Sequence, residues 1–142
     1  MKNYKIVRSD EDIDWNEVRE LIITVDMATY PPELHKKAFN NSYTKVFVFD
    51  ENNRLIAMGR ANSDGAYEAA LYDIAVHPDV QGAGLGRLVV ETLLEDLKGF
   101  NVLLFASPGK EGFYESLGLD RLLTGMIRFT KPDVMREKGF IK

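Results

Sequence analysis

The chain has 142 residues, of which 45% are hydrophobic, 28% are charged and none is cysteine, and its net charge is −4. This length and apolar content predict a single domain over residues 1–142. The absence of cysteine excludes disulfides, cysteine-ligated zinc and a thiol nucleophile, and without a dense basic run we expect no nucleic-acid partner. With neither a signal-peptide pattern nor an apolar run of spanning length, we expect a cytoplasmic protein without membrane contact.

The first half of the chain predicts a strand, two helices and then three antiparallel strands. One helix face is formed by apolar residues at helical spacing, namely Val18, Leu21, Ile22 and Val25. Pro31 and Pro32 end this helix because proline lacks a backbone donor, and a short helix through Leu34 and Phe39 follows. The strands are predicted at residues 4–8, 46–49, 55–59 and 67–76.

The second half predicts two more helices and two more strands. Apolar residues from Leu85 to Leu97 predict a helix that ends near Gly99, and a short buried strand follows at 102–105. Ser107 and Pro108 predict the start of the next helix, and residues 126–129 predict a last strand. The tail after Pro132 is expected to be loosely ordered. Meander strands combined with helical crossovers imply an α/β fold with a mixed sheet.

A glycine-rich loop, Gln81–Gly86, joins a predicted strand to a predicted helix. Glycines allow close approach of a ligand to the backbone, and a helix N-terminus attracts anions, so the loop favours phosphate binding over a plain connection. The third glycine of a dinucleotide-binding fingerprint would fall at Arg87, and the Lys-Ser or Lys-Thr of a P-loop is absent. Both common nucleotide-binding folds are therefore disfavoured.

Two motifs resemble those of the GCN5-related N-acetyltransferase (GNAT) superfamily. Residues 76–87 resemble its motif A through Gln81, Gly84 and Gly86, and residues 113–119 resemble motif B with the sequence FYESLGL. The resemblance covers nearly the whole chain. It implies a central mixed, largely antiparallel sheet that is splayed at the coenzyme A site and has helices on both faces.

The same resemblance implies acetyl-coenzyme A as cosubstrate and no metal. In such enzymes the glycine loop holds the pyrophosphate, and the end of the preceding strand pairs with the pantetheine. The positions that would contact the cosubstrate are Ile74, Ala75, Val76, Gln81, Gly82, Ala83, Gly84, Leu85, Gly86, Arg87, Phe105, Ala106 and Ser107. Ser107 stands where many relatives carry an asparagine that binds pantetheine, which leaves that contact without its usual side chain.

Two residues are candidate catalytic groups. The resemblance implies that Tyr114 protonates the departing thiolate, although Phe113, Tyr114 and Leu117 also share a helical packing face. Asp73 would polarise or orient the amine, because a carboxylate within an apolar strand is costly unless it is paired. The alternative is that Asp73 points outward or forms an ion pair with an arginine. The glutamate base of histone-type relatives falls near Ala70, so that carboxylate is missing.

The resulting hypothesis is a transfer of acetyl to a primary amine of a small molecule, by direct attack in a ternary complex. The candidate substrate-binding residues are Tyr30, Glu33 and Glu68. An arylalkylamine, a polyamine and an amino sugar remain alternatives for the acceptor. Competing hypotheses are a non-catalytic acyl-coenzyme A sensor or scaffold and a protein or peptide N-acetyltransferase. The exposed hairpin edge offers a surface for a homodimer.

Overall fold

The computed structural model describes residues 3–142, and the chain divides into two compact units after Leu104. Within the described residues, the first unit holds a five-stranded sheet and three α-helices. The second unit, Phe105–Lys142, contains two short helices. A single domain over residues 1–142 stays a prediction.

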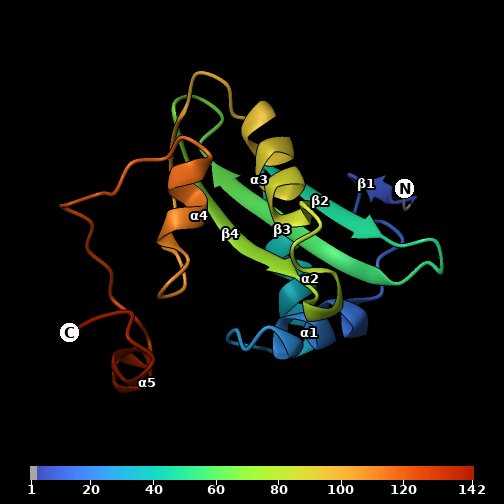
Figure 1. The fold of residues 1–142 in the computed structure, drawn as a ribbon, viewed down its shortest axis with the longest axis horizontal. Coiled ribbons are helices and arrows are strands. Elements are labelled where there is room, and N and C mark those ends of the chain that lie inside the picture. The colour runs from blue at the N-terminus through green and yellow to red at the C-terminus, as the bar shows by residue number, and fades with distance from the viewer. Residues whose placement is uncertain (1–2) are drawn as a thin grey trace. The chain divides into compact units, whose positions relative to one another are not determined.

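The sheet of the first unit has the strand order β1-β2-β3-β4-β5. Figure 1 labels its first four strands. The strands are β1 Lys5–Val7, β2 Thr44–Phe49, β3 Leu55–Ser63, β4 Glu68–Val76 and β5 Asn101–Leu103. Neighbouring strands from β1 through β4 pair antiparallel, whereas β4 and β5 pair parallel. The predicted α/β fold with a mixed, largely antiparallel sheet is thus confirmed.

Both helices predicted before the second strand form, but the first ends at Thr24 and not at Pro31, because the chain turns at Asp26 with φ = +59°. Helix α1, Trp15–Thr24, is capped by Asp14, whose carboxylate accepts a hydrogen bond from the Asn16 N–H at 3.0 Å. The predicted apolar stripe is buried at Val18, Leu21 and Ile22. Helix α2, Pro32–Asn40, begins with a proline. Proline has no backbone N–H, but the N–H groups of the first helical turn have no partner within the helix, so nothing is lost.

Helices cover both faces of the sheet, as expected (Figure 1). The sheet residues buried with α1 and α2 are Phe47, Leu55, Met58 and Ala75. Helix α3, Leu85–Glu95, lies on the other face and brings Val89 and Leu93 against Gly59. A Cβ atom at Gly59 would lie 2.7 Å from Val89 Cγ1, so only glycine fits under this helix. Close packing on both faces holds β3 and β4 in place.

The second unit contains the helices α4, Glu111–Ser116, and α5, Pro132–Glu137. Phe105 makes edge-to-face contacts with Phe129 and Phe140, with ring centroids 5.6 Å and 5.9 Å apart. These aromatic contacts form the apolar centre of the unit.

Three predictions in this region are wrong. The helix predicted from Ser107 begins at Glu111, because the Ser107 carbonyl accepts a hydrogen bond from the Lys110 N–H at 2.9 Å and closes a turn first. Residues 126–129 form no strand, because no neighbouring strand pairs with them in the described part of the chain. The tail is helical over Pro132–Glu137, with Asp133 in the first turn and Arg136 in the last, which suits the helix dipole.

Candidate active site

A β-bulge in β4 is the central irregularity of the sheet. Met58 pairs with Ala75 and Arg60 with Tyr72, so Asp73 and Ile74 together face the single residue between them on β3. Asp73 has φ = +56°, a left-handed conformation that aspartate adopts more readily than most side chains. A bulge of this kind bends its strand and turns a side chain out of the regular alternation. The carboxylate of Asp73 is therefore set apart from the strand pattern.

The edge of β4 that faces β5 is open from residue 71 onward, which includes the bulge. Strand β5 pairs only with Glu68–Ala70, at the beginning of β4. Residues 71–76 have no strand partner on that edge among residues 3–142. An unpaired edge presents backbone donors and acceptors that can pair with an added extended chain. The predicted cosubstrate residues Ile74, Ala75 and Val76 lie on this open stretch.

The glycine loop leads from β4 into α3 by way of a short 3-10 turn, η1, Pro78–Val80. Gly82 and Gly84 have φ = +87° and +83°, and a Cβ atom at either would meet nothing within 4 Å. Gly84 is the N-cap of α3, and no side chain caps this helix end. The loop is exposed, whereas Leu85 behind it is buried. An open helix N-terminus of this form suits an anion.

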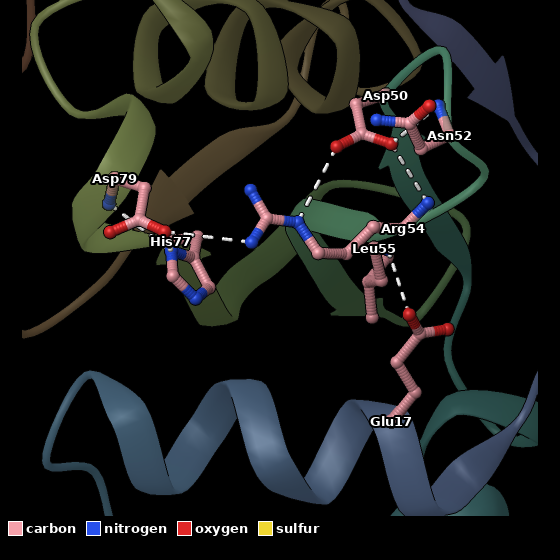
Figure 2. Close-up of polar contacts among 7 residues, drawn as sticks. All are labelled: Glu17, Asp50, Asn52, Arg54, Leu55, His77 and Asp79. Carbon is pink, nitrogen blue, oxygen red and sulfur yellow. Dashed lines mark hydrogen bonds and ion pairs between the residues drawn. The ribbon is translucent and has the colours of Figure 1, made fainter.

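Side chains of the turn between β2 and β3 contact the η1 segment that precedes the glycine loop (Figure 2). The Arg54 guanidinium lies between Asp50, 3.4 Å from Nε, and Asp79, 3.5 Å from Nη1. His77 accepts a hydrogen bond from the Asp79 N–H at Nδ1, 3.1 Å away. The Gln81 side chain donates to the carbonyl of the last β4 residue at 3.2 Å. Exposed ion pairs of this kind contribute only about 0.2–1 kcal/mol each, so together they orient the loop more than they stabilise the fold.

A pocket of about 240 Å³ lies beside the bulge, on the α2 side of the sheet. Its lining residues are Tyr30, Leu34, His35, Ala38, Arg60 and Asp73. Asp73 Oδ2 accepts a hydrogen bond from Arg60 Nε at 2.7 Å, so the predicted alternative of an arginine partner is what the structure contains. Oδ1 has no hydrogen-bond partner in the described part of the chain. The ion pair holds the carboxylate while leaving one oxygen available to a ligand.

The remaining predicted substrate residues lie apart from this pocket. Glu33 is exposed in the first turn of α2 and does not line it. Glu68 begins β4, where its carboxylate accepts a hydrogen bond from the Asn101 side chain at 3.4 Å. The structure therefore brings Tyr30 and Asp73 together and leaves Glu33 and Glu68 outside.

Four pocket residues were missed by sequence reasoning, and the two polar ones among them are Arg60 and His35. The isolated Gly59 within an apolar strand is a signal for a bulge or a close approach, and it would have placed Arg60 next to the irregularity. His35 follows Leu34 on α2 and belongs to no recognised motif. Its side chain is only 4% exposed, which the sequence alone does not reveal.

Tyr114 lies in α4 of the second unit. Its ring contacts Phe113 at a centroid distance of 5.0 Å, and burial raises the pKa of its hydroxyl. A phenol with a raised pKa stays protonated at neutral pH and can donate a proton. The roles predicted for Tyr114 and for Phe105, Ala106 and Ser107 stay predictions.

Arg87, predicted at the phosphates, lies in the first turn of α3 and is exposed. Its Nη1 is 2.7 Å from Glu91 Oε1, one helical turn away. An exposed pair at this spacing is weak, about 0.3–0.5 kcal/mol, so an anion could compete for the guanidinium.

Comparison with known proteins identifies the family. The model of the acetyltransferase (GNAT) family matches residues 14–119. The chain belongs to the GNAT family. Its fold agrees: a GNAT family acetyltransferase from Streptococcus pneumoniae superposes with a TM-score of 0.77 at 24% identity, over 91% of this chain and 99% of that one. The predicted resemblance is thus confirmed, and with it the assignment to acetyltransferases.

Several curated GNAT relatives are similar in sequence. An uncharacterised N-acetyltransferase, ycf52, of Pyropia yezoensis is 33% identical over 78% of this chain and 67% of its own length. Serotonin N-acetyltransferase 2, chloroplastic, of Oryza sativa subsp. japonica is 33% identical over 82% of this chain and 62% of its own. Histone acetyltransferase TAP1 of Glycine max is 32% identical over 81% of this chain and 55% of its own. The chain thus spans about two thirds of these relatives or less.

Two further properties of the described residues concern membranes and metals. Across residues 3–142, no helix has both the length and the apolar content needed to span a bilayer. The same residues contain no group of three or more His, Cys, Asp or Glu side chains placed to hold a metal ion.

Proposed function

We propose that this GNAT protein transfers the acetyl group of acetyl-coenzyme A to a primary amine of a small molecule, by direct attack in a ternary complex. The observation that carries the proposal is the β4 bulge at Asp73. This one feature accompanies the open edge of β4 and also places a carboxylate in the pocket beside α2. Donor and acceptor sites are thereby assigned to neighbouring parts of one strand.

The residues of the first unit fit the donor. The backbone of Gln81–Arg87 would hold the pyrophosphate, because Gly82 and Gly84 leave their surface open and α3 has no side-chain cap. Ile74–Val76 would pair with the pantetheine along the open edge. Acetyl-coenzyme A would supply an acyl group activated as a thioester. The chain contains no cysteine, so the thiol of a protein side chain takes no part in the transfer.

Asp73 supports the acceptor side of the proposal. Its Oδ1 would accept a hydrogen bond from the incoming amine, while Arg60 holds Oδ2 and fixes the direction of the carboxylate. Positioning of this kind brings the nitrogen to one place and one orientation. An amine must be neutral to attack, and a carboxylate within hydrogen-bond reach is a suitable group to receive its proton. Tyr114, with its raised pKa, is the proposed proton donor to the leaving group.

The lining of the pocket favours an arylalkylamine among the three acceptor classes. Tyr30, Leu34 and Ala38 provide an aromatic and apolar wall, which suits a flat ring. A polyamine would need further carboxylates, but Asp73 is the only one in the lining and is already shared with Arg60. The rice relative named serotonin N-acetyltransferase agrees with this choice.

The deciding experiment is thiol release from acetyl-coenzyme A across a panel of amines, followed with a chromogenic disulfide such as DTNB. The panel should contain arylalkylamines, polyamines, amino sugars and a lysine-containing histone peptide. Release that depends on an arylalkylamine supports the proposal. Release only with the peptide would point to a protein acetyltransferase, as the name of the Glycine max relative indicates for that protein. Calorimetric binding of coenzyme A without release for any amine would favour the sensor or scaffold.

A further inference from the structure

His35 lies in the wall of the pocket in an unusual setting for a histidine. The residue belongs to α2 and is 4% exposed. Its Nε2 accepts a hydrogen bond from the backbone N–H of Tyr30 at 3.1 Å, and the two rings meet edge to face at 5.8 Å. The imidazole therefore ties the segment before α2 to the helix.

This hydrogen bond fixes the tautomer of His35. A backbone N–H can only donate, so Nε2 must carry a lone pair, and the proton of the neutral ring sits on Nδ1. Burial lowers the pKa of His35, Arg19 and Arg60 lower it further, and Asp73 opposes them. The ring is thus held neutral with an N–H group at Nδ1.

Nδ1 of His35 is available to a ligand in the pocket. It has no hydrogen-bond partner in the described part of the chain. Every side-chain nitrogen or oxygen there that is fully buried does have a partner, so Nδ1 is not fully buried. Nδ1 is therefore within reach of solvent, and the cavity that His35 lines is the pocket of Tyr30 and Asp73. By contrast, Arg60 already donates from Nε to Asp73 and from Nη1 to Ser42.

From this geometry we infer that His35 determines specificity for the acceptor, by donating its Nδ1–H to an oxygen atom of the substrate that is remote from the amine. The inference rests on the proposed function. It narrows the acceptor to arylalkylamines that carry an ether, hydroxyl or carbonyl oxygen on the ring. Asp73 would hold the amine end, and His35 would recognise the other end. A substrate without that oxygen would leave the Nδ1–H of His35 without an acceptor, and its kcat/KM should therefore be lower.

The test compares amines that differ only in such an oxygen. 2-Phenylethylamine is measured beside its 2-, 3- and 4-methoxy derivatives, and tryptamine beside 5-methoxytryptamine, because an ether oxygen can accept but not donate. For the wild type we expect kcat/KM to favour at least one methoxy amine by about 5- to 10-fold, the value of one neutral hydrogen bond. Equal kcat/KM values across both sets would overturn the inference while leaving the proposed function intact. An absence of turnover with every amine would overturn both.

Two variants separate the two nitrogens of His35. The amide of Gln lies four bonds from Cα, as Nε2 does, so His35→Gln keeps an acceptor for the Tyr30 N–H and loses the Nδ1 donor. The amide of Asn lies three bonds from Cα, as Nδ1 does, so His35→Asn keeps a donor and loses the contact with Tyr30. We expect the methoxy preference to vanish in His35→Gln and to survive in His35→Asn. A preference that survives in His35→Gln would refute the role of Nδ1.

A measurement on the wild-type protein guards against variants that fail to fold. The ¹⁵N shifts of the His35 imidazole report its tautomer directly, and we expect the proton on Nδ1 at neutral pH. On addition of a methoxy amine, the Nδ1 resonance should shift more than it does with the unsubstituted amine. A proton found on Nε2 instead would overturn the inference without any reference to turnover.

Discussion

Arg60 and Asp73 form an ion pair with Nε and Oδ2 2.7 Å apart, and this pair joins β3 to the bulged residue of β4. The guanidinium also lies over the rings of Tyr72 and Phe39, at 5.1 Å and 5.7 Å from their centroids. Cation–π contacts and a charged hydrogen bond thus hold the same group from three sides. The orientation of the Asp73 carboxylate follows from this packing.

Replacing Asp73 by asparagine tests its proposed role in catalysis. Asparagine tolerates a positive φ and is similar in size, so the bulge should persist. We expect kcat with a confirmed amine to fall by about 10²-fold or more, as for loss of a proton acceptor, with unchanged coenzyme A binding. Steady-state kinetics and calorimetry measure the two effects. Unaltered kcat would remove Asp73 from the catalytic site.

Gly82→Ala tests the glycine loop as the phosphate site. The new methyl group has open space but must adopt φ = +87°, which costs about 1–2 kcal/mol. The strained loop should bind coenzyme A several-fold more weakly, as calorimetry can show. Gly112→Ala is the control, since Gly112 lies within helix α4 with ordinary φ and an open surrounding. Equal affinities for the two variants would argue against the loop as the anion site.

Gly59→Ala tests the packing that surrounds the bulge. The added Cβ would lie 2.6 Å from Ile74 Cδ1 and 2.7 Å from Val89 Cγ1, inside a close-packed layer. Overpacking of this kind lowers the free energy of unfolding by about 1–3 kcal/mol. Urea denaturation measures the loss. A wild-type midpoint would mean that α3 can move away from β3 at little cost.

Tyr114→Phe removes the proposed proton donor and keeps the ring. We expect a lower kcat and little change in coenzyme A affinity, since phenylalanine retains the contact with Phe113. Burial raises the pKa of Tyr114 above its ordinary 10.0, so the wild-type donor stays protonated through neutral pH and is lost only in strong alkali. The alkaline limb of the kcat profile should change in the variant. Turnover equal to that of the wild type would exclude Tyr114 as the acid.

Acid pH should weaken the fold through His35. Its folded pKa is lowered from 6.5, so the unfolded chain binds the proton more readily. The contribution to stability is complete above pH 6.5 and is lost as the pH falls through 6.5 toward the folded value. Urea midpoints between pH 7.5 and 5.5 should therefore decline less in His35→Gln than in the wild type. His77→Gln, at the only other histidine, serves as the control; an identical decline in His35→Gln would show that another group causes it.

Much of the fold could be predicted because its signals are local. The spacing of Val18, Leu21 and Ile22 defines α1, and the glycines at 82 and 84 mark the loop before α3. The strand expected at 126–129 failed because strand formation depends on a partner that a sequence pattern does not supply.

The candidate site was harder to predict because it depends on contacts between distant residues. Asp73 was recognised from its apolar surroundings, but its partner Arg60 is 13 positions away on another strand. His35 enters the pocket through the turn of the chain at Tyr30, which no periodicity reveals. Local pattern pointed to the proposed donor loop, whereas the proposed acceptor pocket depends on tertiary contacts.

The bulge determines what the deletion of a single codon would do to this strand. Because it adds one residue opposite Gly59, the loss of the Asp73 codon alone would restore ordinary alternation in β4. Tyr72 would still lie beside Arg60, Ala75 would still face α1 and Ile74 would still face α3, so the buried pattern would survive. The encoded chain would keep its core but lack the carboxylate and the bend. A three-nucleotide deletion could thus give a protein with the same architecture that lacks the proposed catalytic carboxylate.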